Sequence, residues 1–190
     1  MKRYFLPALK LSFVLLLLCS LAYTLVLAGV ARMAPGRGSG EQVYANGRLV
    51  GYRLIGQQFR NDRYFQGRPS AVNYNAAGSG GSNKGPSNPE YLQTVQERID
   101  TFLVHNPGVP RSAIPAELVT TSGSGLDPDL SPAAALVQVK RVAACRKLAE
   151  PLVRQLVAAH IHRPFYGLAG PATVNVLQLN IALDQLTGAR

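Results

Sequence analysis

The stretch "LSFVLLLLCSLAYTLVLAGVA" (Leu11–Ala31) contains 21 residues without a charged side chain. As an α-helix it would be about 31 Å long, which matches the hydrocarbon thickness of a bilayer. A cleaved signal peptide is the alternative, but its apolar section usually covers only about 7–15 residues. The stretch therefore predicts a transmembrane helix at residues 11–31, preceded by a cytoplasmic N-terminus (residues 1–10) and followed by one extracytoplasmic domain (residues 32–190).

Basic residues flank this helix on both sides, and they predict its orientation. They are Lys2, Arg3 and Lys10 before it, and Arg32 and Arg37 after it. Because cytoplasmic flanks carry the excess of basic residues, the small excess before the helix predicts a cytoplasmic N-terminus and a C-terminal domain outside the inner or plasma membrane. The 17 basic and 10 acidic residues after Ala31 do not oppose export, since long domains are translocated largely regardless of their charge.

Seven arginines lie between Arg32 and Arg68, where the only acidic residues are Glu41 and Asp62. Such a cluster can face anionic lipid headgroups, an acidic partner surface or plain solvent. A membrane-anchored binding module for an anionic surface of the cell envelope is therefore one candidate function. Aromatic side chains interleave with these arginines, an arrangement that can stack nucleic-acid bases. Aromatic residues packed under a loop are the more common case, and no nucleic-acid partner is expected for a membrane-tethered chain.

Local signals after the membrane segment predict an α+β domain. Asn46-Gly47 separates two runs rich in Val, Leu, Ile and Tyr, which is typical of a hairpin with a type I′ turn. Asn88-Pro89 and Ser131-Pro132 each suit the cap and first turn of a helix. Further helices are expected at residues 132–138, 140–148 and 150–160, and after a candidate cap at Asn175. The domain should therefore combine a small antiparallel hairpin or sheet with several short helices.

The helix after Asn88 has a regular apolar spacing. Apolar residues recur at helical intervals at Tyr91, Leu92, Val95, Ile99 and Phe102. This face is expected to pack on the core. The charged residues Glu97, Arg98 and Asp100 are left for the outer face.

Two polar, glycine-rich loops each lead towards a helix that begins with proline. The first is "GSGGSNKGPSNP" (Gly78–Pro89) and the second runs from Ser122 to Gly125. Glycines let backbone N–H groups approach a phosphate, and Lys84 could add charge. A nucleotide-binding loop needs Gly-Lys-Ser/Thr at its end, whereas here Asn83 precedes Lys84 and Gly85 follows it. A nucleotide site of that type is therefore not predicted.

No other pattern in the chain indicates catalysis. Asp127 and Asp129 supply two carboxylates where calcium takes about six or more ligands. His160 and His162 are two residues apart, so they lie on different faces of a helix. We therefore predict neither a catalytic residue nor a metal site, and the chain is not expected to be an enzyme.

Three long strings, in this order behind one membrane helix, carry a specific resemblance. They are "GRPSAVNYNAAGSGGSNKGPSNPE" (67–90), "VTTSGSGLDPDLSPAAALVQVKRVA" (119–143) and "VNVLQLNIALDQL" (174–186). Over nearly the whole chain, the sequence resembles the small C subunit of the Kdp-type potassium-importing ATPase. Asp129 stands where that family often has histidine, and Lys140 where proline is frequent, so no family role is carried over to these two positions.

The resemblance implies both partners and a function. The family's C subunit joins a channel-like potassium-binding subunit, a P-type ATPase subunit and a small single-helix subunit within membrane lipid, and it is not itself the ATPase. The implied function is a non-catalytic accessory subunit that supports assembly of the potassium importer. The resemblance also implies a catalytic chaperone that increases the affinity of the ATPase subunit for ATP. No tightly bound cofactor is implied, since ATP and potassium act at the level of the complex.

The family's "SGGSN" string gives the candidate site residues. It matches Gly80, Gly81, Ser82 and Asn83, which the resemblance implies to be either a partner-docking loop or a nucleotide contact. We rank docking first, because ATP is cytoplasmic and the domain is expected outside. The second loop and helix cap give further candidates, namely Ser124, Gly125, Asp127 and Ser131.

Overall fold

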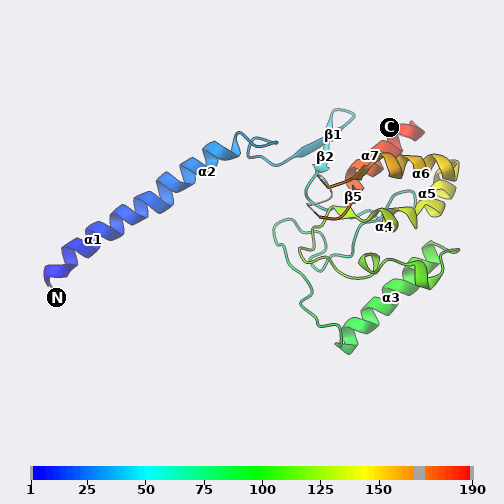
Figure 1. Cartoon of the computed structure of the whole chain (residues 1–190), viewed down its shortest axis with the longest axis horizontal. Helices are drawn as coiled ribbons and strands as arrows, with labels where there is room; N and C mark the ends of the chain where they lie inside the picture. The colour runs from blue at the N-terminus through cyan, green and yellow to red at the C-terminus, as the bar shows by residue number, and fades with distance from the viewer. Residues whose placement is uncertain (1, 165–169, 189–190) are drawn as a thin grey trace. The chain divides into compact units, whose positions relative to one another are not determined.

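The computed structural model describes residues 2–164 and 170–188 (Figure 1). The chain forms two compact units, Met1–Gln42 and Val43–Arg190. The structure has the expected α+β composition, with an apolar N-terminal helix, small antiparallel sheets and several short helices. The fold class predicted from the sequence is therefore confirmed.

One long helix dominates the first unit. It consists of α1 (Lys2–Leu16), a π-helical segment η1 (Leu17–Ala22) and α2 (Tyr23–Ala31). Its section Arg3–Ala31 is long and apolar enough to cross a membrane. Thr24 donates its hydroxyl to the carbonyl oxygens of Ser20 and Leu21 at 2.6 and 2.9 Å. The helix thus satisfies this polar group internally, as a membrane segment requires.

The chain after α2 folds back in a series of tight turns. Arg37 donates its backbone N–H to the oxygen of Ala34 at 2.9 Å, and Ser39 donates to Gly36 at 2.9 Å. A Cβ added to Gly38 would lie 3.6 Å from the Cβ of Ala31. The connection from the helix to residue 40 is therefore compact and stays beside the end of α2.

The second unit begins with the predicted hairpin. Strands β1 (Gln42–Ala45) and β2 (Arg48–Tyr52) form a two-stranded sheet. Asn46 and Gly47 have φ angles of 51° and 74°. Positive φ at both central residues is what a type I′ turn requires, so the hairpin is confirmed.

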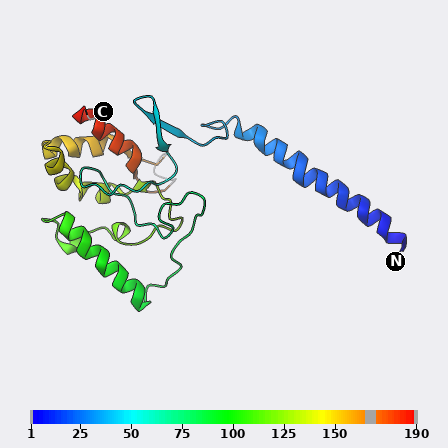
Figure 2. The ribbon, with the colours of Figure 1, turned by 180° about the vertical axis from the view of Figure 1, so that it is seen from behind.

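A second, three-stranded antiparallel sheet lies against the helical core. Its strands are β3 (Asp129–Leu130), β4 (Ile161–His162) and β5 (Thr173–Asn175), in the order β3-β5-β4. The helices are α4 (Pro132–Leu136), α5 (Val139–Arg146), α6 (Glu150–Ala159) and α7 (Val176–Thr187). Figure 2 shows these helices gathered together. Their inner side chains make the core, which includes Leu130, Val142, Val153, Val157, Val174, Leu179 and Leu183.

Side-chain caps set where two of these helices begin. The hydroxyl of Ser131 accepts from the backbone N–H of Ala134 at 3.2 Å. Asn175 ends β5 and its Oδ1 accepts from Gln178 at 3.1 Å, so one residue closes the strand and caps α7. Helix α5 ends at Arg146, two residues earlier than expected, because Lys147 takes a left-handed φ of 56°.

Buried amides hold the long loop between β2 and the helix α3 (Pro89–His105) against the core. Asn180 donates to the oxygen of Phe65 at 2.9 Å and accepts from its N–H at 2.8 Å. Gln138 makes the same pair of bonds with the backbone of Gln66, at 3.0 and 2.9 Å. The loop can therefore bury the Phe65 ring completely without leaving its backbone unpaired.

Helix α3 (Pro89–His105) lies apart from α4–α7 in both views (Figure 1, Figure 2). Its start is as predicted, since Asn88 accepts from the N–H of Tyr91 at 3.0 Å. The predicted inner face is wrong in two places: Leu92 is 53% exposed, whereas Arg98 donates to the oxygen of Val119 at 3.1 Å. No residue of α3 is buried. The other residues of the predicted face, Tyr91, Val95, Ile99 and Phe102, are half-buried, and Phe102 packs against the core. The 3-10 turns η2 (Arg111–Ala113) and η3 (Ala116–Leu118) follow.

Candidate functional site

The two glycine-serine loops lie side by side, although about 40 residues separate them. The backbone N–H of Gly80 donates to the carbonyl oxygen of Ser124 at 2.8 Å. The hydroxyl of Ser79 donates to the same oxygen at 3.0 Å, and Thr121 donates its hydroxyl to Ser82 at 3.2 Å. We call residues 79–83 and 121–125 together the paired loops. The structure thus brings most of the candidate site residues that the sequence indicated in the two loops close to one another.

Close backbone packing explains two of the glycines in the paired loops. Gly125 has a φ of 69°, and a Cβ there would lie 2.7 Å from the Cγ2 of Val72 and 2.8 Å from the oxygen of Gly80. A Cβ on Gly81 would lie 3.0 Å from the oxygen of Gly123. Gly80 is less restricted, because its added Cβ would meet only Val72, at an ordinary 3.6 Å. Gly125 therefore permits the closest approach of the two segments.

A turn at residues 68–74 supports the paired loops from one side. Ser122 donates its backbone N–H to the oxygen of Pro69 at 3.1 Å. Ser70 accepts from Val72 and Tyr74 at 3.2 and 2.9 Å, and the hydroxyl of Tyr74 donates to the oxygen of Arg68. Burial raises the pKa of the Tyr74 hydroxyl, and the nearby charge of Asp127 raises it further. Sequence patterns did not indicate this support, because it depends on contacts between distant segments.

The remaining candidate residues have local structural partners. Asp127 pairs with Arg68 at 3.0 Å and accepts from the N–H of Asp129 at 3.1 Å. Ser131 caps α4 and donates its hydroxyl to Glu117. In the described part of the chain, no hydrogen bond connects Ser131 with the paired loops. Asn83 is exposed and has a left-handed φ of 53°.

Lys84, just beyond the paired loops, has a partner of its own. Its ammonium group donates to the carboxylate of Glu90 at 2.9 Å, and both side chains are largely exposed. This hydrogen bond and the lysine charge lower the pKa of Glu90. The Gly80 N–H is already engaged by Ser124. Two of the donors that a phosphate cradle could use here, the Gly80 N–H and the Lys84 ammonium group, are therefore already engaged within the domain.

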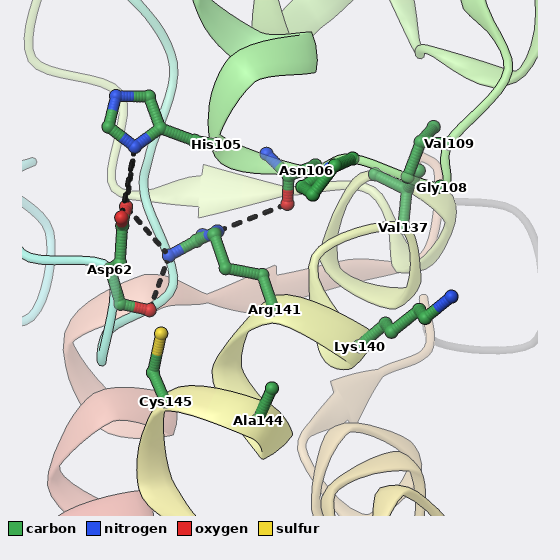
Figure 3. Close-up of a pocket in the computed structure, with 11 residues that line it drawn as sticks. Asp62, His105, Asn106, Gly108, Val109, Val137, Lys140, Arg141, Ala144 and Cys145 are labelled. Carbon is green, nitrogen blue, oxygen red and sulfur yellow. Dashed lines mark hydrogen bonds and ion pairs between the residues drawn. The ribbon is translucent and has the colours of Figure 1, made fainter.

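A pocket of about 260 Å³ lies where the end of α3 meets α5 (Figure 3). Its lining includes Asp62, His105, Asn106, Val109, Lys140, Arg141 and Cys145. The carboxylate of Asp62 lies 2.9 Å from Nδ1 of His105 and 3.6 Å from Nη1 of Arg141. The pocket is thus bordered by a small charged cluster that joins three segments of the domain.

Arg141 uses its guanidinium for internal contacts. Its side chain is only 3% exposed. It donates to the backbone carbonyl oxygens of Asp62 and Tyr64 at 2.6 and 3.0 Å. It also donates to the side-chain oxygens of Asn106 and Gln138 at 3.1 and 2.7 Å. Burial lowers the pKa of Arg141, and the charge of Asp62 opposes that shift. The arginine is therefore a structural tie rather than a free anion-binding group.

The ionisable side chains of this pocket approach it from different directions. The ring of His105 is directed to Asp62, whereas Cys145 extends from α5 on the other side of Asp62 and Arg141 (Figure 3). Among residues 2–164 and 170–188, no group of three or more His, Cys, Asp or Glu side chains could hold a metal ion. The charged groups described around the pocket thus pair with one another, His105 and Arg141 both with Asp62.

Comparison with known proteins identifies the family. The family model described as "K+-transporting ATPase, c chain" matches residues 5–185. The chain belongs to the KdpC family. The resemblance seen in the sequence is confirmed, and the chain is a subunit of the Kdp potassium-transporting ATPase complex.

Individual relatives match over nearly their full length. The potassium-transporting ATPase KdpC subunit of Flavobacterium psychrophilum is 55% identical over 186 residues, which cover 98% of this chain and 100% of the relative. That of Flavobacterium johnsoniae is 54% identical over 186 residues, with the same coverage. That of Bacteroides fragilis is 49% identical over 184 residues, 95% of this chain and 96% of the relative. Of the two functions considered from the sequence, these matches support the ATPase subunit.

Proposed function

We propose that this chain is a non-catalytic docking subunit of the potassium-transporting ATPase and that the paired loops are its docking surface. In this proposal the N-terminus is cytoplasmic, residues 11–31 span the membrane, and residues 32–190 lie outside. The partners are the channel-like potassium-binding subunit, the P-type ATPase subunit and the small single-helix subunit. Membership of the KdpC family and the apolar helix Arg3–Ala31 support this assignment.

The observation that carries the proposal is the way the paired loops are held. Their mutual contacts use backbone groups and short hydroxyls at Ser79, Gly80, Ser82, Thr121 and Ser124. Gly123, Ser124 and Asn83 remain exposed to solvent. A polar surface that is already ordered loses little conformational entropy when it binds. The paired loops therefore suit recognition by another protein better than they suit a flexible linker.

The contacts of the paired loops and of Lys84 also suggest how this chain could affect the affinity of the ATPase subunit for ATP. We propose that a catalytic-chaperone effect of this chain would pass through assembly and not through nucleotide contact at Gly80–Asn83. The engaged N–H of Gly80 and the ion pair of Lys84 with Glu90 support this view. No tightly bound cofactor is then needed, and ATP and potassium act on the other subunits.

Adding bulk in the middle of the surface tests docking without disturbing the fold. A Cβ on Gly123 would meet no atom within 4 Å, so Gly123→Leu should fold normally. We expect this variant to co-purify less of the other subunits from mild detergent. Ala158→Leu is the matched control, because Ala158 is also exposed but lies on α6. If Gly123→Leu and the control recover equal amounts of the partners, the paired loops are not the docking surface.

The orientation needs a separate measurement. Protease added to intact spheroplasts should digest the C-terminal domain, because the proposal places it outside. A domain that is digested only after the inner membrane is broken would overturn both the orientation and an external docking surface.

A further inference from the structure

The hairpin β1–β2 exposes an unusual amount of apolar surface. Tyr44, Leu49 and Leu54 are 59%, 47% and 60% exposed. A two-residue turn places Tyr44 opposite Leu49, so both side chains lie on one face of the hairpin. An isolated two-stranded hairpin is only marginally stable in water. Covering this apolar face with another surface would therefore stabilise the hairpin.

The base of the hairpin is attached to the folded domain. Gln57 donates its side-chain amide to the oxygen of Val50 at 3.2 Å. The buried Asn175 donates to the oxygen of Arg53 at 2.8 Å. The apolar face is therefore presented by an anchored element and not by a loose segment.

A short connection joins the apolar helix to the first strand of the hairpin. Only residues 32–41 separate Ala31 from Gln42, the first residue of β1. Fully extended, such a connection spans at most about 36 Å. It is folded into turns instead, and a Cβ added to Gly36 would collide with the oxygen of Gly40. The strand therefore begins close to the point where the helix would leave a bilayer.

The charges in this part of the chain fit an anionic surface. Between residues 32 and 54 the charged residues are Arg32, Arg37, Arg48, Arg53 and Glu41. Arg48 is exposed and lies next to the hairpin turn. Basic residues near a membrane are attracted to anionic headgroups, and tyrosine prefers the interface between lipid and water.

We propose that the hairpin Gln42–Tyr52 lies on the bilayer surface, with Tyr44 and Leu49 among the lipid headgroups. Arg48 precedes Leu49 in β2 and lies on the opposite face, so it acts through its charge, which the phosphates of anionic phospholipids attract over a distance of about a Debye length. The occupant of this apolar face is thus lipid, held next to the hairpin by the membrane helix. The inference rests on the proposed membrane anchor and adds a second, interfacial contact to it.

Tryptophan fluorescence tests the contact directly, because the chain contains no tryptophan. The full chain is reconstituted in phosphatidylethanolamine and phosphatidylglycerol vesicles, with or without brominated acyl chains. We expect Leu49→Trp to lose most of its emission in brominated vesicles. Val104→Trp is the control, since Val104 is 77% exposed on α3 and should keep its emission. Tyr44→Trp is a second reporter on the same face of the hairpin, should Leu49→Trp fail to fold.

Three further outcomes separate the ways in which the inference can fail. Leu16→Trp, within the apolar helix, should be strongly quenched; if it is not, the membrane anchor itself is wrong and the inference fails with it. If Leu16→Trp is quenched but Leu49→Trp and Tyr44→Trp are not, only the hairpin contact is overturned. The hairpin contact is also overturned if Leu49→Cys forms cross-links to another subunit in the complex and Leu49→Trp is unquenched in vesicles, since the face then covers protein.

The charge contribution has its own comparison. Removing one basic residue near an anionic bilayer should lower the ratio of bound to unbound hairpin roughly fivefold. Arg48→Gln should therefore reduce the quenching of Leu49→Trp in vesicles with phosphatidylglycerol and not in purely zwitterionic ones. Equal quenching in the presence and absence of Arg48 would overturn the assignment of this arginine to lipid phosphate.

Discussion

The backbone N–H of Gly80 donates to the carbonyl oxygen of Ser124 at 2.8 Å, and this bond joins two loops that lie far apart in the sequence. The hydroxyl of Ser79 shares the same acceptor. A backbone bond of this kind needs close approach of the two chains, which the neighbouring glycines allow. The geometry of the paired loops therefore depends on their glycines.

Gly125→Ala should destabilise the domain. The new Cβ would collide with Val72 and the oxygen of Gly80, and the φ of 69° is unfavourable for alanine. We expect a loss of about 1–3 kcal/mol in the free energy of unfolding, measured by urea denaturation. Gly123→Ala is the matched control, because its Cβ meets no atom within 4 Å. Equal losses in the two variants would contradict the packing described at Gly125.

Gly81→Val should reduce complex formation far more than Lys84→Ala. Valine at position 81 would push against the oxygen of Gly123 and separate the paired loops. Lys84→Ala removes only an exposed ion pair with Glu90. The measurements are co-purification of the other subunits and potassium-stimulated ATP hydrolysis. Should Lys84→Ala abolish ATP-dependent activity while assembly persists, a phosphate site at this loop would replace the docking proposal.

Arg141→Met should lower the free energy of unfolding by more than about 2 kcal/mol, because several buried or half-buried oxygens would lose their donor. These oxygens belong to Asn106, Gln138, Asp62 and Tyr64. The adjacent Lys140→Met is the control, since Lys140 is exposed. Urea denaturation compares the two variants. A similar small effect in both would mean that Arg141 does not tie the segments together.

Tyr74 should make the domain sensitive to alkaline pH. Burial raises its pKa above the ordinary value of 10.0, so the folded state holds the proton more tightly than the unfolded state. The resulting stability is fully present below pH 10 and is lost as the pH rises through the folded pKa. Tyr74→Phe should remove this part of the pH dependence, although it also loses the bond to Arg68. The measurement is the free energy of unfolding as a function of pH, from neutral to alkaline. If this free energy falls as steeply with pH in the variant as in the parent protein, the assignment to Tyr74 is contradicted.

Features set by neighbouring residues could be predicted from the sequence. The hairpin follows from Asn46-Gly47, and the start of α3 follows from Asn88, because a turn or a cap involves only residues a few positions apart. The face of α3 could not be predicted in the same way. Helical spacing shows which side chains share a face, but not whether a core lies opposite, and Leu92 is exposed for that reason.

The candidate site was predictable in part. The glycine-serine composition identified both loops, whereas the bond from Gly80 to Ser124 depends on the fold of everything between them. Arg141 was missed because a charged residue in a short helix is normally assigned to solvent. Its burial becomes intelligible only when Asn106, Gln138 and the loop at Asp62 are brought around it.

Under the docking proposal, the pairing of the two loops also makes folding of the domain a condition of recognition. Neither Ser79–Asn83 nor Thr121–Gly125 alone contains the surface, since each orders the other through Ser124 and Ser82. A partner that contacts both loops at once would thus distinguish a finished domain from a nascent, truncated or nicked one. Misfolded or truncated copies would then fail to assemble with the other subunits, and no additional quality-control protein would be needed to remove them from the complex.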